Sequence, residues 1–240
     1  MTNDTPDINE PTPLRERLKK ARIPVDDINT FLAYVLGEKH KERKKDKKPV
    51  TNNTDDMLYT MFIRWHKLGM VIDGVNVVIT GKAMSMVTYH GYKNRVKKTY
   101  PSAIFDVQLV REGDEFKVSK KSGKIEYTHE IANPFEDKPI TGAYCVITIG
   151  EQQYFESLNM ADYGKMKGQS KNQSTWNTWQ SEFVLKSVIK RACKRHFYDV
   201  VQEIDEADND DYGLTDDALE ASDEKMSKII AKAKANADNS

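Results

Sequence analysis

The spacing of hydrophobic residues divides the chain into helical ends and a strand-rich middle. Apolar residues recur at helical intervals in the ranges 25–36, 58–68 and 185–193. In Ile104–Val110, three hydrophobic residues instead alternate with polar ones, as in a half-buried strand, and Ile140–Ile149 follows as a further strand. Helices, then strands, then helices predict an α+β fold in which a central antiparallel hairpin or meander sheet is flanked by helices.

Turn residues predict how the strands connect. Glu112-Gly113 follows the first strand and fits a two-residue hairpin loop, and Ser122-Gly123 marks a second turn. With the first loop in this place, Val110 faces Glu115, and the strand after the turn lies beside Ile104–Val110. We therefore expect consecutive strands to be neighbours in the sheet.

Charge is balanced over the whole chain but strongly separated along it. The 240 residues include 37 Lys and Arg and 37 Asp and Glu, so the formal net charge is zero. Residues 39–48 are almost all basic, whereas residues 196–224 contain no Lys or Arg. This separation favours a polyanion-binding body, with the acidic stretch either an interaction tail or a merely solvated segment.

We expect three regions around a single core. Residues 1–50 form a charged, partly helical N-terminal segment with a basic linker, 51–200 form the core, and 201–240 form an acidic tail. Within the tail, Lys225–Ala235 combines Met and Ile residues with lysines, which predicts a short docking helix.

The cysteines and the N-terminus favour the cytoplasm. Cys145 and Cys193 lie in apolar patterns without a Cys-x-x-Cys motif, as expected of reduced packing residues. The polar start, Met1–Asp4, does not resemble a secretory signal, and no apolar run is long enough to span a membrane. We expect a cytoplasmic protein without membrane contact.

The last helix of the core carries cations on one side. They are Lys186, Lys190, Arg191, Lys194 and Arg195, set against an apolar face. No acid lies between Leu185 and Phe197. Like charges spaced by four residues repel each other, so an anionic partner explains this pattern better than an ordinary solvated face.

Aromatic residues lie among or beside cations at two places. Tyr89, Tyr92 and Tyr100 bracket a basic run, and Trp176 and Trp179 precede the last helix. The basic run consists of Lys93, Arg95, Lys97 and Lys98. Rings for bases and cations for phosphates are what a groove for single-stranded nucleic acid needs. The tryptophans fit equally well as plugs of the core or of a subunit contact.

Enzyme motifs are weak in this sequence. Asp106, Glu115 and Lys117 imitate the Asp…Glu-x-Lys pattern of metal-dependent nucleases. With the hairpin described above, however, the two carboxylates lie about 13 Å apart, too far to share one metal ion. No phosphate-binding loop, metal-ligand spacing of histidines or nucleophile arrangement is present. We predict no catalytic residue, metal or cofactor, and we keep the nuclease as an alternative to a non-enzymatic nucleic-acid-binding protein.

Several short motifs follow one another in a characteristic order between about Thr54 and Tyr198. They are Leu68-Gly69-Met70, Gly91-Tyr92-Lys93, Gly113–Phe116, His129, Ile140–Tyr144, Tyr154–Glu156, the Ser170 loop, Trp176 or Trp179, and the Lys186–Arg195 helix. Together they resemble the RecT family of phage recombinases. Thr precedes both tryptophans where the family commonly has Pro, which leaves their equivalence open. The resemblance implies a Red beta-like fold that pairs complementary strands of DNA without ATP.

The resemblance also implies partners and an assembly. Such proteins bind single-stranded DNA and the annealed duplex intermediate as oligomeric rings or helical filaments. They usually work with a phage 5′→3′ exonuclease and touch the single-strand-binding protein of the bacterial host. By position, Tyr92 and Lys93 match the family's Tyr-Lys, and Lys186, Lys190 and Arg191 match its basic helix. A single-strand-binding protein that does not anneal is the second alternative.

Overall fold

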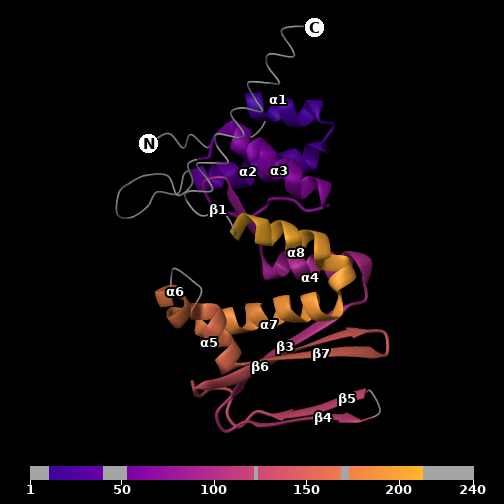
Figure 1. Cartoon of the computed structure of the whole chain (residues 1–240), viewed down its shortest axis with the longest axis vertical. Coiled ribbons are helices and arrows are strands. Elements are labelled where there is room, and N and C mark those ends of the chain that lie inside the picture. Colours follow the sequence, from indigo (N-terminus) through magenta and orange to yellow (C-terminus); the bar gives the residue numbers. More distant parts are fainter. Residues whose placement is uncertain (1–10, 40–52, 122–123, 169–172, 213–240) are drawn as a thin grey trace.

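The computed structural model describes residues 11–39, 53–121, 124–168 and 173–212. The elements of the chain form layers along the long axis of the molecule (Figure 1). N-terminal helices lie at one end, the main sheet and a separate hairpin lie at the other, and further helices lie between them. This combination of helices with antiparallel strands confirms the predicted α+β class.

The N-terminal layer consists of α1 (Pro13–Lys20), α2 (Val25–Lys39) and α3 (Asp55–Lys67). α3 begins after Thr54, whose hydroxyl accepts the backbone N–H of Met57, and it includes most of the range 58–68 in which the sequence predicts helical spacing. The helices share a core in which the Phe31 and Phe62 ring centroids lie 4.6 Å apart. The helical spacing of residues 25–36 predicts most of α2, which in the structure continues through Gly37 to Lys39. Most of the basic run at 39–48 lies outside the described residues.

A short hairpin and one helix connect this layer to the sheet. They are β1 (Val77–Gly81), β2 (Met84–Val87) and α4 (Tyr89–Thr99). The Thr88 hydroxyl accepts the backbone N–H of Gly91 and caps the start of α4. The sequence pattern does not predict α4, because its large buried side chains, Tyr92 and Val96, stand among charged residues.

The main sheet is antiparallel, with the strand order β3–β6–β7. Its strands are β3 (Ile104–Arg111), β6 (Ile140–Ile149) and β7 (Gln152–Asn159). In the central strand β6, Cys145 pairs with Val107 on one side and with Glu156 on the other. α7 (Gln180–His196) covers one face of this sheet (Figure 1) and buries Val188 and Ala192.

The strand after β3 does not pair with β3, which contradicts the predicted hairpin. β4 (Glu115–Lys121) pairs with β5 (Lys124–Glu130) in a separate two-stranded sheet, and β3 pairs with β6. The turn itself lies where the sequence predicts it. Gly113 has a φ of +93°, and the Asp114 N–H donates to the Arg111 carbonyl over 3.1 Å. The chain then leaves the sheet and places the hairpin on the face opposite α7 (Figure 1).

Aromatic packing and a buried polar network hold this hairpin on the sheet. The Phe116 ring stacks on Tyr144 with centroids 5.0 Å apart, and Tyr127 lies 5.4 Å from the same ring. His129 has one ring nitrogen 3.2 Å from the Asp114 carboxylate and the other 3.3 Å from the Tyr144 hydroxyl. The His129 and Asp114 side chains are each only 5% exposed. The hairpin therefore gains a face-to-face interface in place of edge pairing with β3.

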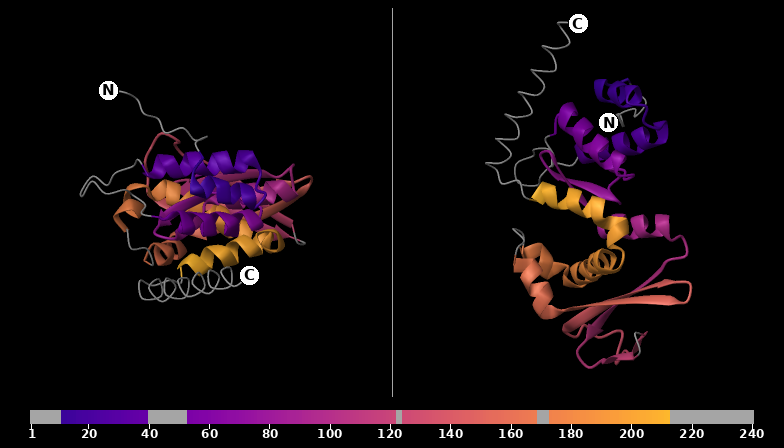
Figure 2. Two further views of the ribbon diagram at one scale, coloured as in Figure 1. Left: turned by 90° about the horizontal axis from the view of Figure 1, so that it is seen from above. Right: turned by 45° about the vertical axis from the view of Figure 1, so that its right-hand side comes forward.

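The C-terminal helices return to the middle of the molecule. They are α5 (Met160–Gly168), α6 (Gln173–Thr178), α7 and α8 (Tyr198–Tyr212). α8 lies between α7 and the N-terminal layer (Figure 1 and Figure 2) and buries Val201, Ile204 and Ala207. The expected boundary between core and tail at residue 200 thus falls inside a packed helix. Residues 213–240, with the predicted docking helix, lie outside the described part of the chain. No described helix has the length and apolar character needed to cross a membrane.

Candidate nucleic-acid interface

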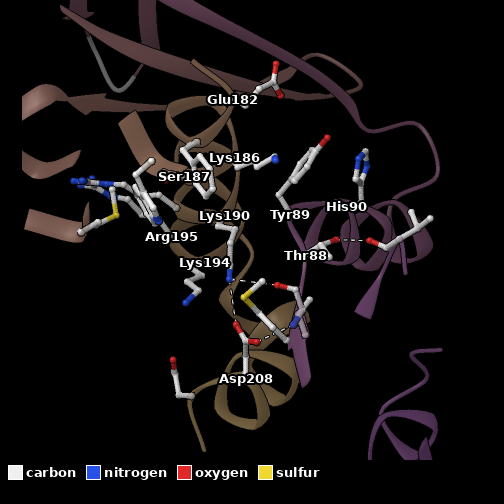
Figure 3. Close-up of a pocket in the computed structure, with 18 of the residues that line it drawn as sticks. Thr88, Tyr89, His90, Glu182, Lys186, Ser187, Lys190, Lys194, Arg195 and Asp208 are labelled. Atoms are coloured by element: carbon white, nitrogen blue, oxygen red, sulfur yellow. Dashed lines mark hydrogen bonds and ion pairs between the residues drawn. The ribbon is translucent and has the colours of Figure 1, made fainter. Parts of the chain in front are cut away.

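A groove of about 970 Å³ lies between α4 and α7 in the middle layer (Figure 3). β2 and the start of α4 form one wall, α7 forms the other, and residues of α5, α6 and α8 complete the lining. The five cations predicted on the last helix all line it: Lys186, Lys190, Arg191, Lys194 and Arg195. The rings in the lining are Tyr89, His90, Trp176 and Phe183. The predicted combination of cations with rings therefore meets in one place.

The two predicted tryptophans lie in different surroundings. Trp176 lines the groove, where its ring stacks on Phe183 with centroids 4.6 Å apart and also contacts Tyr163. Trp179 precedes α7, is 60% exposed, and does not line the groove. Trp176 thus fits both interpretations, because it packs against neighbouring rings and also lines the groove, where it could stack on a base.

Lys186 is held in the groove by rings. Its Nζ lies 5.9 Å from the Tyr89 ring centroid and 5.3 Å from that of Phe183, and no described carboxylate pairs with it (Figure 3). Burial, with the charges of Lys93 and Lys186, lowers the pKa of the neighbouring His90 below its ordinary value. Lys186 is therefore an α7 cation that a phosphate can reach without displacing a carboxylate partner among the described residues.

Lys190 and Lys194 pair with carboxylates of α8. The Lys190 Nζ lies 3.1 Å from Asp208, whose side chain is only 3% exposed (Figure 3). Asp208 also accepts the backbone N–H of Val87 over 2.8 Å, and Lys194 pairs with Asp205. These two lysines therefore fasten α8 to α7 and to the end of β2.

Arg191 and Arg195 converge on a buried carboxylate of β7. Arg191 lies 2.8 Å and Arg195 3.2 Å from Glu156, and His196 lies 3.4 Å from the same side chain. Arg191 also pairs with Asp162 of α5 over 3.1 Å. Burial alone raises the pKa of Glu156, but His196 and the two arginines outweigh it and hold the pKa below its ordinary value.

These pairs correct the interpretation of the cationic face. Because α7 contains no acid between Leu185 and Phe197, its sequence predicts cations that repel one another and bind an external anion. In the structure, four of the five cations have carboxylate partners within the chain. Those partners come from β7, α5 and α8, which are distant in sequence or lie beyond the end of the helix. The helix sequence alone cannot reveal partners that only the fold brings close.

Tyr92 is buried and does not face the groove as a stacking surface. Its ring is fully inaccessible, and its hydroxyl donates to Asp205 over 2.8 Å. Burial, followed by the charge of Asp208, raises the pKa of Tyr92 far above its ordinary value. Lys190 lies over the ring, with its Nζ 4.8 Å from the centroid. This placement does not fit the expected contact between Tyr92 and a base, and it makes Tyr92 part of the α4–α7–α8 core.

The other predicted residues of α4 separate into different roles. Lys93 lies over the Phe105 ring of β3, with its Nζ 5.4 Å from the centroid. Arg95 donates to two backbone carbonyls, one after α3 at 3.0 Å and one in α8 at 3.1 Å, and so ties these elements together. Lys97 and Lys98 are exposed on the last turn and do not line the groove. The basic run therefore does not form one continuous surface.

The positions of Asp106 and Glu115 do not support the nuclease alternative, which requires their carboxylates to share one metal ion. Asp106 lies on β3 of the main sheet, and Glu115 lies on β4 of the separate hairpin. Glu115 and Lys117 are both exposed and pair with each other over 3.4 Å. In the described part of the chain, no group of three or more His, Cys, Asp or Glu side chains is arranged to hold a metal ion.

Two groove residues are not singled out by the sequence pattern. Phe183 lies one turn before Lys186, and this spacing of a ring and a cation on one helix face is the signal that identifies it. His90 adjoins Tyr89, with the two ring centroids 3.9 Å apart, at the start of the unpredicted α4. The sequence alone does not show that these two rings share a groove, because the fold brings α4 and α7 side by side.

Comparison with known protein families gives a match to most of this chain. A sequence model of the RecT family matches residues 60–229. This range includes all the strands and helices that line the groove. The chain therefore belongs to the RecT family, whose members are single-strand annealing proteins of DNA recombination. No curated protein sequence gives a significant match to this chain.

Proposed function

We propose that this protein anneals complementary single strands of DNA without ATP, and that the α4–α7 groove holds a strand while it pairs. The observation that carries the proposal is the meeting of Tyr89, Trp176 and Phe183 with the α7 cations in one groove. Rings stack on any base and cations attract any phosphate, so such a groove accepts strands without regard to sequence. Membership of the RecT family supports the same activity.

Lys186 and Arg195 are the cations that we assign to phosphates. Lys186 has ring contacts but no described carboxylate partner. Arg195 is 65% exposed, and its partner Glu156 is also held by Arg191 at a shorter distance, 2.8 Å. Since the remaining groove cations already have internal partners, few counterions are released on binding. The salt dependence should then correspond to a small number of phosphates, with a slope of about −0.7 for each one neutralised on a single strand.

Tyr89 and Trp176 are the rings that we assign to bases. Both line the groove and are only partly buried, so each keeps an accessible surface. Trp179, exposed at the start of α7, extends the aromatic surface beyond the groove and contacts the strand as it leaves. Contacts of this kind hold phosphates and base faces but leave base edges free for a complementary strand.

The proposed assembly and setting follow from the family resemblance. We expect the protein to coat single-stranded DNA as a ring or helical filament, so that neighbouring grooves join into one path and retain the annealed duplex intermediate. We further expect it to act in phage recombination in the cytoplasm of the bacterial host, beside a 5′→3′ exonuclease and the host single-strand-binding protein. Pairing of two strands makes and breaks no covalent bond, so this activity needs no catalytic residue, metal or cofactor.

Strand pairing tests the proposal. Two complementary oligonucleotides, one carrying a fluorophore and the other a quencher, are mixed with the purified protein without ATP or metal. We expect pairing faster than in the protein-free control, with both strands intact on a denaturing gel. Binding without faster pairing would replace the proposal with the passive single-strand binder. In a parallel mixture with added magnesium, shortened strands that disappear in Glu115→Gln would replace it with the nuclease.

A further inference from the structure

The loop between β5 and β6, residues 131–139, presents one aromatic side chain to solvent. Phe135 is 95% exposed, and Ile131 in the same loop is 53% exposed. Isolated exposed apolar residues are common on protein surfaces, so exposure alone decides nothing. The exposed position of Phe135 is notable because hydrogen bonds hold the surrounding loop in one conformation.

Hydrogen bonds fix the loop at its tip. The backbone N–H of Phe135 donates to the Asn133 side chain over 3.1 Å, and that of Glu136 approaches the Asn133 carbonyl at 3.4 Å. Pro134 precedes the exposed ring and restricts the backbone further. The Phe135 ring is therefore held out by an ordered turn.

Hydrogen bonds also fix the two ends of the loop to the turn after β3. The N–H of Ala132 donates to the Asp114 carboxylate over 3.1 Å. Arg111 donates to the Asp137 carboxylate over 2.7 Å and to the Lys138 carbonyl over 2.6 Å. An aromatic residue on an already ordered backbone loses less entropy on docking than one on a disordered loop, which favours its use as an anchor residue in a protein interface.

A receptor for such an anchor lies on α3 of the same chain. A depression of about 440 Å³ there is lined by Tyr59, Ile63 and Leu68, with Arg64 and Lys67 also in the lining. Ile63 and Leu68 are only partly buried against the core, so their outer surfaces remain available, whereas Arg17 lies over the Tyr59 ring, 4.2 Å from its centroid. An aromatic side chain buries about 150–250 Å² in an interface, which suits a depression of this size.

The charges around the two surfaces are complementary. Acids near the loop are Glu112, Glu130, Glu136 and Asp137, against the cations Arg111 and Lys138, which leaves an excess of negative charge. The lining of the α3 depression contributes Arg64 and Lys67 and no acid. Complementary charge of this kind orients partners as they meet.

We propose that Phe135 of one copy docks in the α3 depression of a second copy of this chain. The hairpin end, which carries the loop, and α3 lie at opposite ends of the molecule, so Phe135 does not reach its own receptor (Figure 1). A contact between two different surfaces repeats from copy to copy, and it closes into a ring or continues as a helical filament. The inference rests on the proposed function in one respect, since it names the surfaces of the assembly proposed there.

Cross-linking between two variants tests the contact directly. Glu136→Cys, which leaves the neighbouring Phe135 ring in place, and Thr60→Cys, an exposed position in the depression, are mixed with a short bismaleimide and single-stranded DNA. We expect a covalent dimer from the mixture and none from either variant alone. The native Cys145 and Cys193 are fully buried and should stay unreactive, which the unmodified protein checks. Val118→Cys, an exposed position on β4 of the neighbouring hairpin, mixed with Thr60→Cys, is the matched control.

The outcomes are distinguishable from those of the strand-pairing experiment. A mixed product no greater than the Val118→Cys control, or a product of Glu136→Cys with itself, overturns the proposed contact. Phe135→Ala should also reduce the assembly mass in light scattering while leaving the unfolding midpoint unchanged, and an unchanged mass overturns the contact too. If the protein speeds strand pairing but gives no mixed cross-linked dimer, the proposed annealing function stands and the proposed contact fails. If it gives the mixed dimer but does not speed pairing, the contact stands and the annealing function fails.

Discussion

Lys190 of α7 and Asp208 of α8 form an ion pair at the floor of the groove, with the ammonium nitrogen 3.1 Å from the carboxylate. Asp208 is almost fully buried and also accepts the N–H of Val87. Lys190 therefore acts mainly as an internal counter-ion, whereas Lys186, one turn earlier, lies over two rings and pairs with no carboxylate in the described part of the chain. Two neighbouring lysines on one helix thus have different roles.

Alanine substitutions should separate these roles. Lys190→Ala leaves Asp208 buried with fewer partners, and we expect it to lower the free energy of unfolding by about 1–3 kcal/mol. Lys186→Ala should change it by less than about 0.5 kcal/mol, because no buried partner is left behind. Lys186→Ala should instead weaken binding of single-stranded DNA equally for all sequences. Urea unfolding and fluorescence anisotropy measure the two effects, and normal DNA affinity in Lys186→Ala would remove this residue from the interface.

Tyr92→Phe should destabilise the protein without changing DNA binding. The substitution removes the hydroxyl that donates to Asp205 over 2.8 Å, and the expected loss is about 1 kcal/mol in the free energy of unfolding. The ring remains in place, so the groove keeps its shape. Weaker DNA binding at full stability would show that the Tyr92 hydroxyl contacts DNA after all.

Glu156→Gln should strengthen DNA binding while it weakens the fold. The buried carboxylate holds Arg191, Arg195 and His196, and its neutralisation frees the positive charge of Arg195 for phosphates and leaves Arg191 paired only with Asp162. We expect tighter binding at low salt and a steeper salt dependence, since more cations exchange counterions for phosphates. Glu151→Gln, on the exposed turn before β7, is the matched control. An unchanged salt slope would contradict the idea that Glu156 competes with DNA.

Asp114 should make the stability of the protein depend on acidic pH. Burial alone raises its pKa, but hydrogen bonds from the backbone of Arg111 and Ala132, with His129, hold the pKa below its ordinary value. A depressed folded pKa gives stability that is present above the ordinary carboxyl pKa and lost as the pH falls through the folded value.

Urea unfolding of Asp114→Asn across acidic pH checks this prediction. The variant should be less stable than the wild type at pH 7, and the difference should shrink as the pH falls. Glu115→Gln, at the exposed neighbouring position, should follow the wild type throughout. A difference in stability that stays constant with pH would show that the Asp114 charge does not support the hairpin.

Local patterns in the sequence predicted elements better than contacts. Thr54 marks the start of α3, and the alternation at Ile104–Val110 marks β3, because caps and strand periodicity are local properties. The partner of β3 was mispredicted, because the choice between edge pairing and packing of the β4–β5 hairpin depends on Tyr144, distant in sequence. Helical spacing, which is also a local property, identifies the α7 cations as candidates. It cannot identify their carboxylate partners, because the fold brings these from β7, α5 and α8.

Photo-cross-linking of DNA to the protein most directly tests the claim that the α4–α7 groove holds a single strand. A single-stranded oligonucleotide carrying 5-iododeoxyuridine is bound, irradiated and digested, and the modified residues are located by mass spectrometry. We expect cross-links to Tyr89, Trp176 or Phe183, which line the groove, and their loss in Lys186→Ala at matched protein concentration. Cross-links confined to the β4–β5 hairpin or to the N-terminal helices would contradict the account.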